Sequence, residues 1–325
     1  MCQSVCLIVP SRILVKLGDI ESALASERLR GHRAAMTMNF AGAVPAGEKR
    51  RTIYDARNND RLPGKLVRGE GDPATGDRDA DAAYDNAGNT YDFYFQVLAR
   101  RSIDNRGLRI DSTVHFKKGF NNAFWNGQQM VYGDGDNRLF TGFATCIDVV
   151  AHELTHGVTQ YTVPGGALVY SGQSGALNES ISDVFGSVVK QWVKKQDVQS
   201  ADWLIGEGIM APGVGKALRS MKDPGNTAVT WSGDDQPQDM GGYVEGGDVH
   251  TNSGIPNHAF YLAATGIGGN SWEKAARIWY RALSLINPNT GFAEFAKATI
   301  DAANGLGFQP EAQHVESAWR KVQVI

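Results

Sequence analysis

The chain has 325 residues, of which 42% are hydrophobic and 21% charged, and its formal net charge is −3. This composition is typical of a globular protein with one large or two modest domains, and it excludes a largely disordered chain. Lys and Arg form no dense stripe, so neither nucleic acid nor a membrane surface is an expected partner. The sparse cysteines, Cys2, Cys6 and Cys146, argue against a disulfide framework.

The first region runs to about residue 50 and starts with a short apolar stretch that is broken by Pro10 and Arg12. This stretch is too short to span a membrane and is a poor secretory signal, so we expect no classical signal peptide. The region ends at the basic step formed by Lys49, Arg50 and Arg51, which we interpret as a processing site.

Two larger regions follow, and they differ in their expected secondary structure. Residues 51–150 are rich in Gly, Asp and short β-favouring runs such as STVHF and QMVYGDGD, which predicts a strand-dominated region. Within it, apolar residues spaced by three and four predict one amphipathic helix over residues 84–98. Residues 151–325 show helical periodicity, clearest at 177–192 and 272–283. We therefore predict an α+β chain with a β-rich part followed by a mainly helical part.

The stretch VVAHELTHGV carries two histidines four positions apart, with a glutamate directly after the first. Positions i and i+4 of a helix share one face, so His152 and His156 can bind a single ion. Glu153 would then lie beside the ion, where a carboxylate can accept a proton from water. Because HExxH also arises by chance, a polar accident on a surface helix remains the alternative for this motif alone.

A catalytic zinc site usually has three protein ligands and one open position, so a third donor is expected. Glu179 lies on the helix predicted at 177–192, after a glycine-rich loop that can reverse the chain. Asp183 is one turn further and can accept the second ring N–H of a ligating histidine. Alone, each carboxylate would be interpreted as a solvated helix charge. Together with HExxH, they predict a zinc site.

Several blocks together resemble the thermolysin family of metalloendopeptidases, and in particular its protealysin-like members with a short pro-segment. The resemblance implies a two-lobed thermolysin-like (zincin) α+β fold, with the active-site cleft between the lobes and the HExxH helix at its base. It implies a pro-segment at 1–50, a β-rich catalytic lobe at 51–150 and an α-helical catalytic lobe at 151–325. The matching blocks are NNAFWNGQQMVYGDGD, DVVAHELTHGVTQYT, SGALNESISDVFGSVV, ALRSM and VHTNSGIPNHAFYLAA.

The resemblance also implies a role for individual residues. His152, His156 and Glu179 match the zinc ligands, with Glu153 as the general base and Asp183 as a supporting carboxylate. The residues that match oxyanion stabilisers are His250 and Tyr170. Those that match substrate contacts are Asn122 and Ala123 for the peptide backbone and Arg219 for a carbonyl group. An apolar pocket for the side chain beyond the cut is implied for Phe140, Phe143, Val149, Ile205, Ile209 and Leu218.

The loop before His250 departs from the family pattern, which has an aspartate five residues earlier and two glycines directly before VH. Here the sequence is VEGGDVH, so Glu245 takes the aspartate position and Asp248 replaces a glycine. We predict that His250 still functions and that one of these two carboxylates orients it.

The calcium positions of the family also differ. Lys190 replaces a calcium-binding carboxylate, and its ammonium can supply charge and three hydrogen-bond donors to the acidic residues aligned near it. These residues are Asp148, Asp202 and Glu207. Lys216 falls on another calcium position, where a solvated lysine is an equally good interpretation. We expect one catalytic Zn²⁺, leave Ca²⁺ open, and predict that a calcium-specific chelator changes stability little.

The stretch CLIVPSRIL resembles the pro-segment of protealysin-like precursors, although the family's Pro-Pro-x-Tyr is reduced here to Pro10, Ser11 and Arg12. We expect a latent precursor held by its own pro-segment in cis. Cys2 or Cys6 could bind the zinc as a switch, but hydrophobic packing or simple exposure is the favoured interpretation.

The sequence as a whole predicts a zinc endopeptidase that cuts proteins or peptides on the N-terminal side of bulky hydrophobic residues. We expect a monomer without a membrane span, either secreted by a non-classical route, as the family resemblance implies, or cytoplasmic. The alternative is an inactive, peptide-binding member of the same fold. Such a relative would be expected to lose Glu153 or His250, and both are present.

Overall fold

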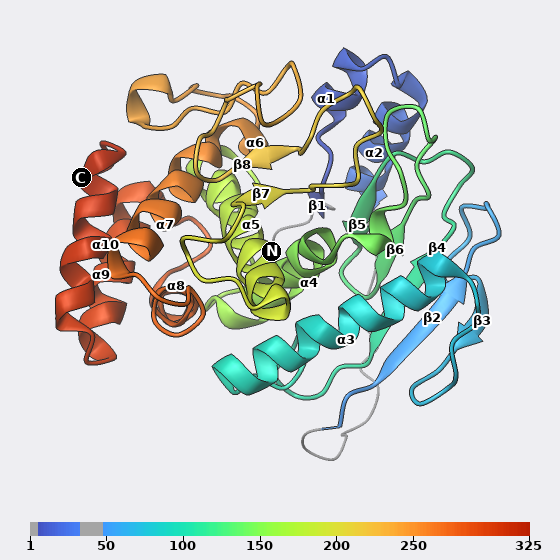
Figure 1. The fold of residues 1–325 in the computed structure, drawn as a ribbon, viewed down its shortest axis with the longest axis horizontal. Coiled ribbons are helices and arrows are strands. Elements are labelled where there is room, and N and C mark those ends of the chain that lie inside the picture. Colours follow the sequence, from blue (N-terminus) through green and yellow to red (C-terminus); the bar gives the residue numbers. More distant parts are fainter. Residues whose placement is uncertain (1–5, 33–47) are drawn as a thin grey trace. The chain divides into compact units, whose positions relative to one another are not determined.

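The computed structural model describes residues 6–32 and 48–325 (Figure 1). These residues form two compact units, each described here by itself. The N-terminal unit contains the described residues up to 158 together with 206–216, and the C-terminal unit contains 159–205 and 217–325. The expected boundary at residue 150 lies inside the helix α4 (Ile147–Thr162).

A mixed β-sheet is the framework of the N-terminal unit. Its strand order is β1-β5-β6-β4-β2-β3, with β2 parallel to β4, β4 parallel to β6, and the other neighbours antiparallel. The predicted run STVHF overlaps the end of β4, and QMVYGDGD contains β6, so the prediction of strands in this region is confirmed. Among the described residues, the strands are β1 (Cys6–Leu7), β2 (Arg51–Asp55), β3 (Lys65–Arg68), β4 (Ile110–Val114), β5 (Ala123–Trp125) and β6 (Met130–Tyr132).

The predicted amphipathic helix is α3 (Arg78–Leu98), which lies along β2 and β4 in Figure 1. Asp77 caps its first turn by accepting the N–H groups of Asp79 and Ala80 at 2.9 and 3.0 Å. A side-chain cap of this kind is worth about 1 kcal/mol. The buried face includes the predicted Tyr84 and Tyr91, so both the helix and its orientation are confirmed.

His115 connects the start of α3 to the loop after β6, because its ring contacts one carboxylate from each. Its Nδ1 lies 2.8 Å from Asp134 Oδ1, and its Nε2 lies 2.9 Å from Asp77 Oδ2. The hydrogen bond and charge of Asp134 outweigh the effect of burial, and with Asp77 they raise the pKa of His115 to about 9. Asp79 is the third carboxylate near this ring.

This shift predicts a pH-dependent contribution of His115 to stability. A pKa raised above its unfolded value stabilises the fold fully below about pH 6.5, and the gain is lost as the pH rises through about 9. Since the Asp77 and Asp134 side chains are 44% and 30% exposed, we expect His115 to contribute only about 1–2 kcal/mol to the free energy of unfolding. Urea unfolding should show that His115→Gln costs most near pH 6 and little near pH 9.5. An equal cost at both pH values, or the same pattern for the exposed His314→Gln, would contradict the assignment.

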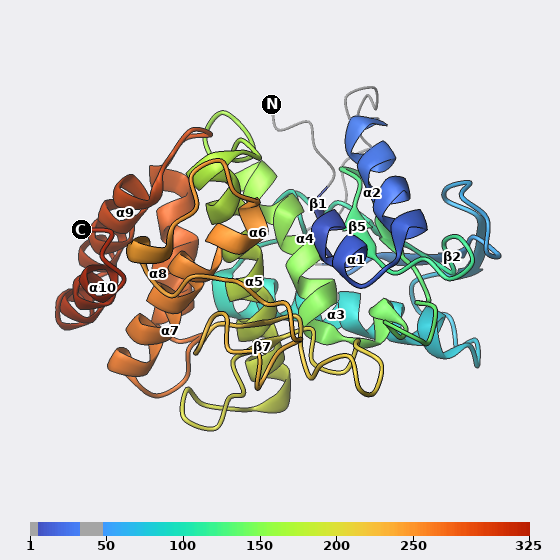
Figure 2. The same cartoon turned by 90° about the horizontal axis from the view of Figure 1, so that it is seen from above.

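The segment after β1 forms two helices that lie beside β1 and β5 in Figure 2. They are α1 (Ser11–Lys16) and α2 (Ile20–His32). Leu7 joins Phe116, Phe120 and Phe124 in one buried cluster, against which Ala25 of α2 also packs. The N-terminal segment is therefore bound to the sheet through its own apolar residues.

The basic step that was predicted as a processing site is part of the folded N-terminal unit. The carbonyl oxygen of Arg50 accepts the N–H of Ile110 at 2.9 Å, and Arg51 is the first residue of β2. The Arg51 guanidinium is bound to Glu70, with Nε to Oε2 at 2.8 Å, and the residue is only 9% exposed. Cleavage after Arg51 would require this strand to unpair, whereas Lys49 and Arg50 precede the strand and are partly exposed, so processing at this step stays a prediction.

The C-terminal unit is mainly helical, as predicted. Its central helix α5 covers the predicted segment 177–192, and the second predicted segment contains α8, which starts after Trp272. Trp279, Trp319 and Phe295 form an aromatic core between the last helices. The helices are α5 (Gly172–Lys194), α6 (Val249–Asn252), α7 (Gly254–Ile267), α8 (Ala275–Ala282), α9 (Phe292–Gly305) and α10 (Gln309–Lys321); β7 (Leu204–Ile205) pairs with β8 (Arg219–Ser220).

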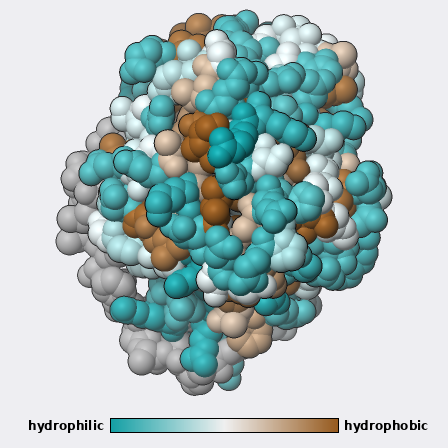
Figure 3. Space-filling model, turned by 90° about the vertical axis from the view of Figure 1, so that its left-hand side faces the viewer, coloured by the Kyte–Doolittle hydropathy of each residue, from teal (hydrophilic) through white to brown (hydrophobic). Residues whose placement is uncertain are grey.

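The surface that carries α9 and α10 is mostly hydrophilic, with apolar residues in small separate groups (Figure 3). Leu285 and Leu306 are examples of apolar side chains that remain 45% and 39% exposed in this unit. Scattered apolar residues of this kind are ordinary on folded surfaces. Within 6–32 and 48–325, every helix is too short or too polar to cross a lipid bilayer.

Candidate active site

The two histidines of HELTH lie on one face of α4, as the spacing predicts. His152 is 0% exposed and His156 3%, and their Nε2 atoms are 3.1 Å apart. Two imidazole nitrogens on one tetrahedral zinc ion, each at about 2.0–2.1 Å, would be about 3.3 Å apart. The nitrogen donors and their separation therefore fit a zinc ion.

Glu153 is buried beside the edge of the sheet. Its Oε2 accepts the backbone N–H of Trp125, in β5, at 2.9 Å. The close approach of α4 to this strand depends on Gly157, where a Cβ atom would lie 2.4 Å from Ile103 and 3.2 Å from the Trp125 ring. This bond to Trp125 was not predicted, because the sequence gives no sign of which strand faces the helix.

Asn122 and Ala123, the predicted backbone contacts for substrate, bind the N-terminal segment in this structure. Asn122 accepts the N–H of Val9 at 3.0 Å through Oδ1 and donates to the Val9 carbonyl at 2.8 Å through Nδ2. The Ala123 carbonyl accepts the N–H of Ile8 at 3.3 Å. The N-terminal segment therefore occupies the edge of β5 to which an extended peptide would be added.

In the C-terminal unit, Glu179, Tyr170 and His250 converge. The Tyr170 hydroxyl donates to Glu179 Oε1, and His250 Nε2 lies 3.1 Å from Glu179 Oε2. The same hydroxyl is 3.4 Å from His250 Nε2. Gly175 permits this approach, since a Cβ atom there would lie 2.5 Å from a methyl carbon of Val249. Tyr170 and His250, the two predicted hydrogen-bond donors to an oxyanion, thus face the predicted zinc-binding carboxylate.

Asp248, and not Glu245, is the carboxylate that contacts His250. Its Oδ1 accepts the His250 backbone N–H at 2.8 Å and lies 2.9 Å from the ring Nδ1. Burial by itself would lower the pKa of His250, but Glu179 and Asp248 outweigh burial and raise the pKa. Glu245 is exposed. The Gln236 amide, which sequence reasoning missed, donates to the His250 carbonyl at 2.6 Å.

These contacts predict different effects for the two carboxylates in the loop. We expect Asp248→Ala to lower kcat by about 10-fold or more, because His250 loses the contact that fixes its ring and tautomer. Glu245→Ala should retain nearly full activity and is the matched control. Steady-state cleavage of a fluorogenic peptide would measure both variants. Equal activity of the two would contradict a positioning role for Asp248.

Asp183 and Arg219 form a buried ion pair in the C-terminal unit. The Arg219 Nε and Nη2 atoms donate to the two oxygens of Asp183 at 2.9 and 2.8 Å, and the Asn257 amide donates to the same carboxylate at 2.9 Å. Arg219 is 2% exposed and Asp183 0%. Burial lowers the pKa of Arg219, but Asp183 outweighs it and raises the pKa. Asn257, which lies in a matched block, was not singled out from the sequence.

The six residues predicted to line the specificity pocket are all fully buried. Four belong to the N-terminal unit, where the Phe140 and Phe143 rings are 5.6 Å apart. In the C-terminal unit, Leu218 donates its N–H to the Ile205 carbonyl at 2.9 Å. The six pocket residues, each 0% exposed, are Phe140, Phe143, Val149, Ile205, Ile209 and Leu218.

Lys190 has partners within the C-terminal unit. Its Nζ lies 2.8 Å from Asp202 Oδ1 and donates to the Leu204 carbonyl at 2.6 Å, and the side chain is 3% exposed. Asp148 and Glu207, the other expected partners, belong to the N-terminal unit. Their partners there include the Gly206 N–H, 3.2 Å from Asp148 Oδ2, and the Lys216 ammonium, 3.7 Å from Glu207.

Comparisons with known families agree with the class of protein that this arrangement suggests, a metallopeptidase. Residues 38–160 match the family described as "Thermolysin metallopeptidase, catalytic domain", and residues 166–324 match "Thermolysin metallopeptidase, alpha-helical domain". The chain therefore belongs to the thermolysin family of metallopeptidases. The predicted enzyme class and the thermolysin-like fold are confirmed.

Individual relatives cover from 84% to 98% of the chain. It is 44% identical to the "Extracellular metalloprotease" of Pectobacterium carotovorum subsp. carotovorum, with 98% of this chain and 96% of the relative aligned. It is 45% identical to "Protease PrtS" of Photorhabdus sp. (strain Az29), with 84% of this chain and 76% of the relative aligned. The solved precursor of protealysin, a metalloproteinase from Serratia proteamaculans, matches with a TM-score of 0.88 and 45% identity, over 98% of this chain and all of that one.

Proposed function

We propose that the chain is the latent precursor of a zinc endopeptidase that cuts before bulky hydrophobic residues. The observation that carries this proposal is the pair of buried histidines, with their Nε2 atoms 3.1 Å apart, on the helix turn that also holds the buried Glu153. The proposed zinc ligands are His152, His156 and Glu179. A bound zinc ion would act as a Lewis acid on the scissile carbonyl and lower the pKa of water to about 7.

The chain's own residues would carry the proton transfers. Glu153 accepts a proton from the attacking water as the water oxygen bonds to the carbonyl carbon. Tyr170 and His250 donate hydrogen bonds to the carbonyl oxygen as it becomes negative. Glu153 then passes the proton to the amide nitrogen while the C–N bond breaks, which leaves an amine and a carboxylic acid, and the acid's proton moves to the amine at neutral pH.

Substrate binding would use the edge of β5 and the apolar pocket. Asn122 and Ala123 already bind an extended segment in this structure, so we infer that a substrate backbone takes the same hydrogen bonds. The six apolar residues predicted for the pocket carry no charge, which favours a large apolar side chain just after the cut. Arg219 is proposed to bind a substrate carbonyl while it holds Asp183.

Latency would follow from the same hydrogen bonds. While residues 6–9 occupy β5, a substrate cannot, so removal of the N-terminal segment is the activating step. The cut is proposed to fall in the basic step from Lys49 to Arg51. We also propose that the enzyme acts outside the cytoplasm, because the Pectobacterium relative is named an extracellular protease.

The experiment that tests this function is digestion of casein by the processed chain, with the products mapped by mass spectrometry and zinc measured in the same sample. We expect one zinc per chain and cuts mainly before Phe, Leu, Ile and Val. Cuts without that preference would contradict the pocket. Cleavage by a zinc-free enzyme would contradict the mechanism.

Lys190 is proposed to replace a structural calcium ion. Its ammonium is buried against Asp202 and the Leu204 carbonyl, which are groups that a calcium ion could otherwise bind. We predict that a calcium-specific chelator shifts Tm by less than about 2 °C at fixed zinc, whereas Lys190→Met lowers Tm by several degrees. Lys216→Met, at the 61% exposed lysine, is the matched control and should change Tm little. A large chelator effect would show that calcium is still bound.

A further inference from the structure

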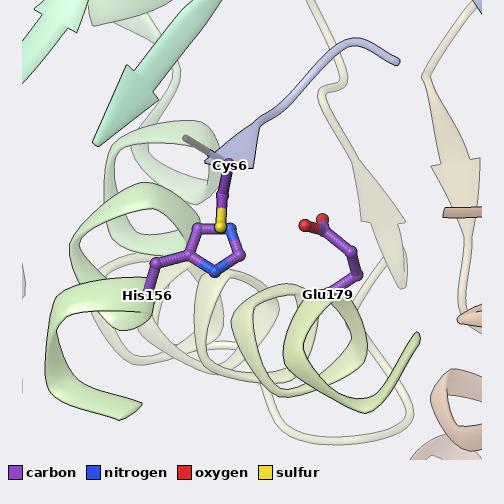
Figure 4. Close-up of side chains that lie close together, drawn as sticks. All are labelled: Cys6, His156 and Glu179. Carbon is purple, nitrogen blue, oxygen red and sulfur yellow. The ribbon is translucent and has the colours of Figure 1, made fainter. Parts of the chain in front are cut away.

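Cys6 lies next to the predicted zinc ligands of the N-terminal unit. Its side chain is directed from β1 toward the His156 imidazole in Figure 4, and its Sγ is within 4.8 Å of a ring nitrogen. Cys6 is 2% exposed, so this thiol is enclosed by protein. A thiolate and an imidazole bound to one tetrahedral zinc ion would be about 3.5–4 Å apart, which the separation allows.

The strand register explains why the thiol points this way. Cys6 pairs with Trp125, and Leu7 pairs with Phe124. Because successive side chains of a strand point to opposite faces, the packing of Leu7 into the phenylalanine cluster turns Cys6 toward the other face. That is the face of α4, since Trp125, which lies directly opposite Cys6, packs its ring against α4 at Gly157, where a Cβ atom would lie 3.2 Å from the ring.

We propose that the Cys6 thiolate is a zinc ligand of the latent chain and occupies the position that the attacking water needs. The inference rests on the proposed function, in which His152 and His156 bind the zinc. Sulfur is a preferred zinc ligand, and the thiol loses its proton to solvent as the S–Zn bond forms, so no oxidant or reductant is required. Latency then has two components, the hydrogen-bonded β5 edge and the thiolate, and removal of the N-terminal segment eliminates both.

Cobalt can report the ligand directly, because a thiolate bound to Co²⁺ adds a strong near-ultraviolet charge-transfer band. The experiment loads the metal-free, full-length chain with Co²⁺ in a Glu153→Gln background, which prevents self-cleavage. We expect the band in the parent chain and its loss in Cys6→Ser. Cys146→Ser is the matched control, since that thiol instead contacts Asp148 and the Glu207 carbonyl, and it should keep the band. Cys2→Ser, at a residue outside the described ones, should keep it too.

The results separate this inference from the proposed function. One cobalt per chain without the band, or a band that disappears in Cys2→Ser or Cys146→Ser, would overturn the role of Cys6 and leave the metal site intact. No cobalt in the parent chain would instead contradict the zinc enzyme itself. X-ray absorption gives a second readout on the zinc-loaded parent chain itself, where one sulfur atom is expected among the zinc ligands. A ligand shell of nitrogen and oxygen alone would overturn the proposal even if Cys6→Ser folded poorly.

Discussion

We expect the Glu153→Gln variant to hydrolyse peptides about 10²–10⁴-fold more slowly than the parent enzyme, while its zinc content stays at one per chain. The reason is that an amide cannot accept the proton that Glu153 takes from water, although it has nearly the same shape. The glutamine oxygen can still accept the N–H of Trp125, which lies 2.9 Å from Glu153 Oε2 in the structure. The variant therefore isolates proton transfer from the packing of α4 against β5.

The measurement is kcat/KM for a fluorogenic peptide, with zinc determined in the same preparation. His156→Ala is the informative comparison, since it should lose both zinc and activity. Full activity in Glu153→Gln would exclude Glu153 as the base. Loss of zinc from Glu153→Gln would mean that its effect is structural.

The parts of the site that follow helical spacing could be predicted from the sequence. His152 and His156 share a face because a helix repeats every 3.6 residues, and the structure places both on α4. Glu179 and Asp183 lie on one helix for the same reason. By contrast, the conformation of the loop decides whether Glu245 or Asp248 contacts His250. The distance of each residue from His250 in the sequence does not show which of the two makes the contact.

The pairing of the N-terminal segment with β5 could not be predicted from local pattern. β1 is only two residues long and pairs with a strand more than a hundred positions away, so no periodicity in the sequence predicts either the strand or its pairing. Sequence reasoning therefore favoured packing or exposure for Cys6, whereas the strand register turns its thiol toward His156. A different non-local contact buries Arg51: it pairs with Ile110 of β4 and binds Glu70, so its basic character alone does not show that it is only 9% exposed.

The buried pair of Asp183 and Arg219 predicts the largest stability effect. We expect Arg219→Met to cost about 3–5 kcal/mol, because it leaves the Asp183 carboxylate charged and 0% exposed without its main partner. Asn257 still donates to that carboxylate at 2.9 Å, but a neutral amide cannot balance its charge. Urea unfolding of the full-length chain in the Glu153→Gln background would measure the loss.

Two further variants distinguish a buried charge from lost packing. The double variant Arg219→Met with Asp183→Leu should recover much of the loss, because no charge then remains unpaired in the interior. Arg320→Met removes an exposed arginine paired with Glu316 at 2.6 Å, and it should cost less than about 1 kcal/mol. If Arg219→Met costs no more than Arg320→Met, the pair does not stabilise the C-terminal unit. If the double variant is as unstable as the single one, the guanidinium acts through its packing, and the charge of Asp183 is balanced by other groups.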